Sequence, residues 1–259
     1  MDHPSLEAFL ESGRAVLARG PIGVVLIEDL VEVESTIRHQ LRIGARAVLA
    51  YAPSGWQVPA DLAAVVHRIP FDLRGPDALT RAINPLIAAC PETTWLHYCY
   101  NAEYLFYPFS ETRNLAELLA FHAEERRDAM LTYVVDLYAA DLEKNPDAVC
   151  LSEAMLDRSG YFALARKLEN GQALDRQYDF FGGLRWRFEE HVPESRRKID
   201  RIGLFRAQKG LKLRPDHTFN IEEYNTYACP WHHNLTASIV SFRVAKALKS
   251  NAGSTFNIP

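Results

Sequence analysis

The stretch Trp95-Leu96-His97-Tyr98-Cys99-Tyr100-Asn101-Ala102-Glu103-Tyr104-Leu105-Phe106-Tyr107-Pro108-Phe109 is an apolar run that breaks at one amide-acid pair and then resumes. The part up to Tyr100 predicts a buried strand, and we expect Glu103 to lie at its exit. Ligands of open α/β sheets bind at the carboxyl ends of strands, so a carboxylate there is a candidate for holding a metal ion or a nucleotide phosphate. Pro108 should end the extended segment, because proline cannot donate to a strand ladder.

Two further strand exits precede this one. Residues 23–27 are apolar and run into Glu28-Asp29, and residues 47–51 run into Pro53-Ser54-Gly55. Exits of parallel strands meet at one edge of a sheet, so these three indicate a composite site.

The order of elements predicts an α/β fold. Before residue 110 we expect strands at 23–27, 47–51, 65–69 and 94–100, with helices at 30–44, 59–64 and 77–89. Strands that alternate with helices in this way favour a mainly parallel sheet flanked by helices. After Pro108 the pattern predicts a helix at 114–130, strands at 131–138 and 202–206, and a final helix at 235–248. With no repeat and no linker, residues 1–259 are interpreted as one domain with an elaborated α+β second half.

Composition excludes some classes of partner. The chain has 259 residues, 48% of them hydrophobic and 24% charged, with a net charge of -4. This balance argues against a nucleic-acid binder, although the basic run at 194–198 could contact an anion. Four scattered cysteines indicate reduced thiols and hence a cytoplasmic location. No apolar run is long enough for a transmembrane segment, so we expect none.

Several short motifs together resemble one enzyme family. They are Glu28-Asp29 after the first strand, His39 ahead of Gly44, Tyr51-Ala52-Pro53-Ser54, and Asn101-Ala102-Glu103-Tyr104. This series resembles the nucleotide-sugar-binding half of inverting family 2 glycosyltransferases of the GT-A fold, which is Rossmann-like. Downstream, Phe181-Gly182-Gly183, Arg197-Lys198-Ile199 and residues 213–219 are similar in order to some family 2-like proteins. The resemblance implies a nucleotide-sugar-binding half at about residues 20–110 and an acceptor-side half at about 111–259.

The metal motif of that family is altered here. Family members carry Asp-x-Asp-Glu-Phe, whose acids bind a divalent cation that bridges the donor diphosphate. This chain has Tyr100-Asn101-Ala102-Glu103-Tyr104, in which two acids are neutral under either alignment, and Ala52 replaces a further acid. The resemblance implies that Mn²⁺ or Mg²⁺ would be held by Glu103 and Asn101. An amide and one carboxylate form a weaker set of hard oxygen ligands than two carboxylates.

The resemblance implies a glycosyltransferase that moves a sugar from a nucleotide-diphosphate-sugar donor to a saccharide or other hydroxyl acceptor, with inversion. Glu28, Asp29, Ser54 and Asn101 would then bind the nucleotide. Asp136 would be the general base, and His217 would face the phosphate or the acceptor. The alternative is a catalytically degenerate GT-A-like protein that acts as a binding or regulatory partner in polysaccharide assembly, as the missing acids suggest.

Three smaller patterns have competing interpretations. Cys229, His232 and His233 could share zinc, but a structural site needs four ligands, so packed side chains are favoured. Residues 122–128 look catalytic, yet the helical offsets from Glu124 to Arg127 and Asp128 favour a solvated, salt-bridged face, with Glu124 and Arg127 as the ion pair. Gly182-Gly183 predicts a tight turn beside the cleft, with an ordinary hairpin turn as the alternative.

Overall fold

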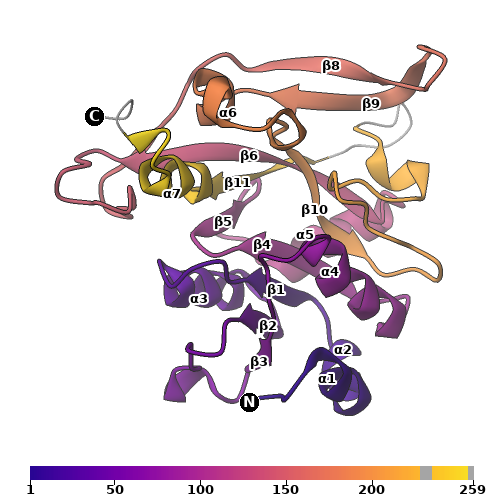
Figure 1. Cartoon of the computed structure of the whole chain (residues 1–259). Coiled ribbons are helices and arrows are strands. Elements are labelled where there is room, and N and C mark those ends of the chain that lie inside the picture. Colours follow the sequence, from indigo (N-terminus) through magenta and orange to yellow (C-terminus); the bar gives the residue numbers. More distant parts are fainter. Residues whose placement is uncertain (228–234, 256–259) are drawn as a thin grey trace.

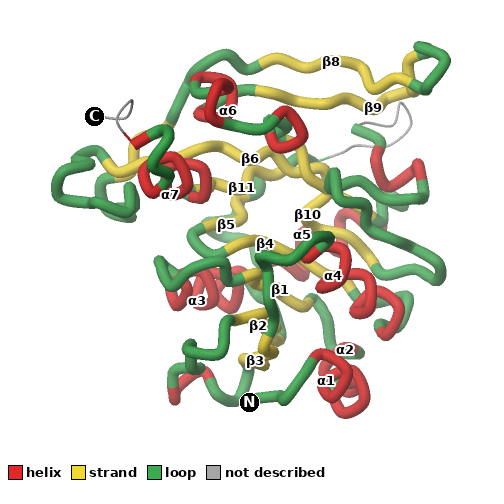
Figure 2. Tube along the Cα trace, in the orientation of Figure 1, coloured by secondary structure: helices red, strands yellow, loops and turns green. Residues whose placement is uncertain are grey.

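The computed structural model describes residues 1–227 and 235–255, and it shows an α/β protein built on one large, curled, mixed sheet (Figure 1). Within these ranges the strand order is β3-β2-β1-β4-β10-β6-β11-β5, and β7 pairs with β6 beside this path. Helices flank both faces of the sheet (Figure 2). The α/β class expected from the sequence is therefore confirmed.

The first four strands are the regular part of the sheet. They are β1 (Ile22–Leu26), β2 (Ala47–Ala52), β3 (Val66–Pro70) and β4 (Trp95–Tyr100). All are parallel, and Ile22 lies opposite Ala47 on one side and Leu96 on the other. Since β2 and β3 lie on one side of β1 and β4 lies on the other, the strand order reverses between β1 and β4.

Strand alternation explains how the helices cover this region. Val24 and Leu26 face a core formed with α1 (Leu6–Ser12) and α4 (Ala78–Ala89). Val25 faces the opposite core with α3 (Val33–Ile43), which ends at Gly44 with a φ of 113°. Ser5 caps α1 because its side chain accepts from the N–H of Ala8, and a four-residue helix α2 (Arg14–Leu17) follows. Strands that are buried on both faces have continuous apolar sequences, which is why the sequence predicts β1 to β4.

The second half adds antiparallel strands and short helices. Its strands are β5 (Glu103–Phe106), β6 (Ala129–Ala139), β7 (Ala154–Leu156), β8 (Phe162–Lys167), β9 (Ala173–Phe181), β10 (Asp200–Arg206) and β11 (Ala237–Ser241). Its α-helices are α5 (Leu115–Glu124), α6 (Leu184–Arg187) and α7 (Arg243–Ser250). The hairpin of β8 and β9 forms a separate layer over β6 (Figure 1). Short 3₁₀ turns lie at Ala60–Leu62, Glu189–His191, Glu194–Arg196 and Glu222–Asn225.

The expectation of a mainly parallel sheet is not confirmed. Parallel pairing holds for β1 to β4 and for β6 with β11, whereas β10 is antiparallel to both β4 and β6 and β5 is antiparallel to β11. The sheet is mixed because β10 inserts beside β4 in the opposite direction. Only the part of the sheet from β3 to β4 has the expected Rossmann-like arrangement.

Two helix predictions in the second half need correction. The helix expected at 114–130 ends at Glu124, and residues 129 and 130 already belong to β6. The helix expected at 235–248 is instead strand β11 followed by α7, because Ile239 and Val240 are β-branched and pair with Leu105 and Tyr104 of β5. Across the described ranges, no helix has the length and apolar character needed to cross a bilayer.

Candidate anion-binding site

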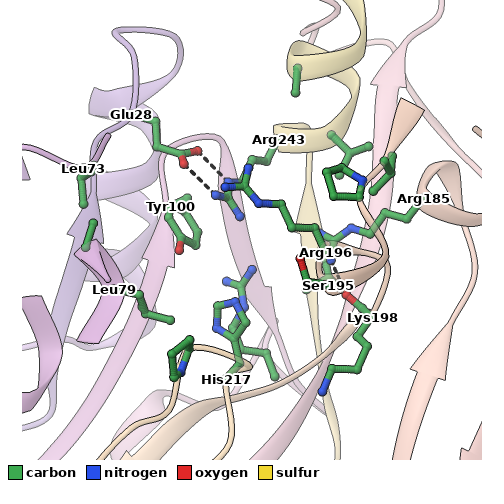
Figure 3. Close-up of a pocket in the computed structure, with 18 of the residues that line it drawn as sticks. Glu28, Leu73, Leu79, Tyr100, Arg185, Ser195, Arg196, Lys198, His217 and Arg243 are labelled. Carbon is green, nitrogen blue, oxygen red and sulfur yellow. Dashed lines mark hydrogen bonds and ion pairs between the residues drawn. The ribbon is translucent and has the colours of Figure 1, made fainter. Parts of the chain in front are cut away.

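A cavity of about 730 Å³ lies at the carboxyl ends of β1 and β4. Its walls come from the residues after β1, the start of α4, helix α7, the segment from 191 to 198, and the loop around His217 (Figure 3). The place where strand order reverses in an open α/β sheet leaves a crevice between loops that diverge to opposite faces. The cavity therefore occupies the position where such folds bind ligands.

The cavity walls carry more basic than acidic side chains. Seven Lys or Arg side chains line it, namely Arg74, Arg185, Arg196, Lys198, Arg201, Arg243 and Lys246. Five acids line it as well: Glu28, Asp29, Asp77, Asp200 and Asp216. A concave, partly desolvated surface concentrates the field of such charges, so the excess favours an anionic ligand. The basic run predicted to contact an anion contributes Ser195, Arg196 and Lys198 to this wall.

Glu28 is bound to Arg243 across the mouth of the cavity. The two carboxylate oxygens of Glu28 accept from Nε and Nη2 of Arg243, each at 2.6 Å (Figure 3). The guanidinium carbon of Arg243 also lies 3.5 Å from the ring centre of Tyr100. This bidentate pair with an aromatic stack ties the end of β1 to the start of α7.

Asp29 lines the cavity beside that pair, and buried Asn101 lies behind it. Both oxygens of Asp29 accept from Nζ of Lys246, at 3.0 and 2.9 Å. Burial alone would raise the pKa of Asp29, but Lys246 and the amides of Val31 and Asn101 hold it below its usual value. The Oδ1 atom of Asn101 accepts from the backbone N–H of Glu28 at 2.9 Å, so Asn101 links the ends of β4 and β1. Asp29 and Asn101 therefore both lie at the carboxyl-terminal edge of the sheet, where the sequence predicted them.

Glu103 is fully buried at the start of β5 and does not face the cavity with Glu28. Its carboxylate accepts from Nη1 and Nη2 of Arg201 at 2.7 and 3.2 Å, and also from Ser241 and the N–H of Tyr100. Burial would raise the pKa of Glu103, yet the charge and hydrogen bonds of Arg201 lower it to about 2. Glu103 is therefore a permanently charged partner that holds Arg201 in place.

Asp136 is also fully buried and lies behind the cavity wall, in β6. Its Oδ1 is 3.8 Å from Nε of Arg185, and neither oxygen has a well-formed hydrogen bond within the described ranges. Burial raises the pKa of Asp136 to about 6, although Arg185 and the backbone N–H groups of Arg185 and Leu184 oppose that effect. The expected general base thus contacts the cavity only through Arg185.

His217 is on the cavity wall, in the loop before Thr218. Its φ of 66° is strained for a non-glycine residue, and its ring stacks on Tyr98 with Nδ1 2.9 Å from the Tyr98 hydroxyl. Burial lowers the pKa of His217 well below its usual value, and the charges of Arg201, Arg243 and Arg185 lower it further. The imidazole is consequently neutral at physiological pH.

Other predicted features are elsewhere. Ser54 is exposed after β2, outside the cavity lining, and its carbonyl accepts from Arg68. His39 is buried on α3 and bonds the carbonyl of Leu105. The Cys229, His232 and His233 pattern lies outside the described residues. The helical ion pair proposed for Arg127 is wrong: α5 ends before it, and Arg127 pairs with Glu223 while Asp128 pairs with Arg206.

Gly182 and Gly183 form the tight connection from β9 to α6, with φ values of 145° and 65°. The expected positive φ is confirmed, and the turn is not a hairpin. A Cβ on Gly183 would lie 2.8 Å from Oδ2 of Asp136. This close approach places the start of α6, and with it Arg185, against the buried carboxylate.

The residues expected to hold Mn²⁺ or Mg²⁺ do not fit that role in this structure. Both oxygens of Glu103 are engaged by Arg201, Ser241 and the backbone, and Oδ1 of Asn101 accepts from Glu28. In the described ranges no three His, Cys, Asp or Glu side chains gather as metal ligands do. Hard divalent cations need several oxygens with free lone pairs, and here those lone pairs face N–H groups.

Sequence reasoning missed the basic side chains of the site. Arg243 and Lys246 fall in the final helix expected at 235–248, and no pattern in the sequence marked Arg185 or Arg201 as site residues. A signal existed in their spacing, because Arg243 and Lys246 are three residues apart and so share one face of a helix. Their acidic partners are more than two hundred residues away, which no local pattern can indicate.

No family model matches this chain, and no curated protein is significantly similar to it.

Proposed function

We propose that the protein is a glycosyltransferase that binds a nucleotide-diphosphate sugar in this cavity and transfers the sugar to a hydroxyl acceptor with inversion. The observation that supports this proposal most is the excess of basic side chains in a cavity at the point where strand order reverses. A diphosphate is the anionic part of such a donor, and its charge increases at the leaving oxygen as the sugar departs. A cytoplasmic location belongs to the same proposal, since the described cysteines are free.

The two ends of the cavity suit the two parts of the donor. Leu73 and Leu79 supply an apolar wall beside the start of α4, which suits a nucleoside. Arg243 and Lys246 lie in the first turn of α7 and line the cavity. Arg185 approaches Arg243 from the other side (Figure 3). The diphosphate would lie between these cations, which would stabilise it as the leaving group.

In the proposed reaction, His217 accepts the proton of the acceptor hydroxyl. The acceptor oxygen forms a bond to the anomeric carbon as the bond from that carbon to the diphosphate oxygen breaks, and the nucleoside diphosphate leaves with the electron pair. His217 can take this role because it borders the cavity and is neutral, and the negative charge of the bound diphosphate would offset the arginine charges that lower its pKa. Asp136 acts as a positioning residue, since it reaches the cavity only through Arg185.

The experiment is a turnover assay with UDP-, GDP- and dTDP-sugars, in which release of free nucleoside diphosphate is measured with sugar acceptors present. We expect release from at least one donor, and the product should have the inverted anomeric configuration. His217→Asn should reduce turnover by about a hundredfold or more while donor binding stays within a few fold. Retained configuration, or full turnover in His217→Asn, would contradict the assignment.

A second candidate function is donor binding without transfer, as a regulatory partner in polysaccharide assembly. It is favoured by the ion pairing of the cavity acids Glu28 and Asp29 and by the burial of Asp136. A protein that binds a nucleotide sugar, yet releases no nucleoside diphosphate with any acceptor or with water, would support this function instead.

A further inference from the structure

We propose that the cavity binds a diphosphate without a divalent cation, because basic side chains of the chain itself occupy the places where a metal would act. This inference rests on the proposed function and specifies how its donor is held. It follows from the mismatch between the metal site that the sequence implies and the side chains that surround it.

Each acid at or behind the predicted metal and nucleotide site has a cationic partner. Glu28 pairs with Arg243, Asp29 with Lys246, Glu103 with Arg201 and Asp136 with Arg185. Three of these pairs have contacts between 2.6 and 3.2 Å, and the fourth is at 3.8 Å. The acids are therefore neutralised internally.

A metal ion in this position would have to displace those partners. If Mn²⁺ took the oxygens of Glu28 and Asp29, Arg243 and Lys246 would lose their counter-charges while a divalent cation arrived beside them. Like charges a few ångströms apart repel by several kcal/mol at the effective dielectric of a protein surface. Lys246 is 7% exposed and cannot easily move into water. The existing pairs thus exclude a metal.

The same cations retain capacity to bind an anion. Arg243 uses Nε and Nη2 for Glu28, which leaves the two N–H groups of Nη1 outside that pair. Arg185 is 6% exposed and lines the cavity; its Nε faces Asp136 and its Nη1 donates to the carbonyl of Lys198, which leaves the N–H groups of Nη2 outside these contacts. Arg74 and Arg196 border the cavity and form no ion pair within the described part of the chain. These donors suit the oxygens of a diphosphate.

The test is calorimetric titration of the full chain with inorganic pyrophosphate and with UDP, GDP and dTDP, first in EDTA and then with Mn²⁺ or Mg²⁺. We expect saturable binding in EDTA, with an affinity changed less than about threefold by either cation. Arg243→Ala and Lys246→Ala should each weaken binding by about tenfold or more. Thermal unfolding of each variant confirms that it is folded at the titration temperature, and Arg243→Lys, which keeps the charge, should retain part of the affinity.

The matched control is Lys249→Gln, which removes a charge from the same helix outside the cavity lining and should change affinity less than threefold. Binding that appears only with Mn²⁺ or Mg²⁺ would overturn this inference and leave the proposed function standing. Absence of binding in both conditions would overturn both. Equal weakening by Lys249→Gln would also overturn it, because it would indicate a general charge effect.

Discussion

At the scale of single residues, the buried ion pair of Glu103 and Arg201 shows why an acid in an apolar run is ambiguous. The side chain is 0% exposed, and a charged group at that depth needs a partner. From sequence, the partner could be a metal ion or a distant arginine. Arg201 is ninety-eight residues away and bonds both oxygens, so we expect the carboxylate to serve structure and not ligand binding.

We expect Glu103→Gln to destabilise the protein by about 3–5 kcal/mol, because it leaves Arg201 buried without its counter-charge. Urea unfolding measures this loss. The control Glu34→Gln removes an exposed pair with Arg38 and should cost less than about 1 kcal/mol. A small loss for Glu103→Gln, together with a loss of Mn²⁺-dependent nucleotide binding in folded protein, would restore Glu103 as a metal ligand.

Asp136 should make stability depend on pH. Its pKa is raised from 3.8 to about 6 in the folded state, so the folded protein holds a proton that the unfolded chain releases. The stabilisation from this proton is fully present below pH 3.8 and is lost as the pH rises through about 6. The difference between 3.8 and about 6 corresponds to about 3 kcal/mol of unfolding free energy. As the pH rises from about 4.5 to about 7.5, the free energy of unfolding of Asp136→Asn should therefore increase relative to that of the native chain.

The measurement is thermal unfolding of both proteins across that pH range. A difference between them that does not change with pH would show that Asp136 titrates normally. Asp and Asn have nearly the same shape, so the packing contribution to the stability difference between the two proteins should be the same at every pH.

At the scale of elements, the sequence predicted the N-terminal half well. Strands β1 to β4 and helix α4 lie within two residues of their expected ranges, because buried parallel strands are apolar runs and their helices are amphipathic. Residues 235–248 were misassigned because the alternation in β11 spans five residues only, and its pairing with β5 and β6 is a tertiary effect. The site's arginines were missed for the same reason, since their partners are distant in sequence.

Helix α6 depends on Gly183, so Gly183→Ala should be strongly destabilising. Its φ of 65° and ψ of -152° belong to a region that only glycine enters readily, and a Cβ would meet Asp136 at 2.8 Å. We expect a loss of about 2–4 kcal/mol in urea unfolding. Gly171→Ala is the matched control, because Gly171 also has positive φ, 82°, but has nothing within 4 Å. Equal losses would mean that the contact with Asp136 is unimportant.

At the scale of the whole molecule, α7 and the end of β1 close the cavity from opposite ends of the chain. Glu28 with Arg243 and Asp29 with Lys246 are the contacts that join them. Neither pair can be inferred from a local pattern, yet together they hold α7 against the end of β1 at the cavity. The first strands place the acids, and the C-terminal helix supplies the cations.

The central claim is that this cavity binds a nucleotide-diphosphate sugar, and equilibrium titration of the full chain with UDP-, GDP- and dTDP-sugars tests it most directly. We expect one-site binding of at least one donor, weakened about tenfold or more by Arg243→Ala and less than threefold by Lys249→Gln. If folded protein binds none of these donors, or binds one equally well after Arg243→Ala, the cavity is not the donor site and the claim is contradicted.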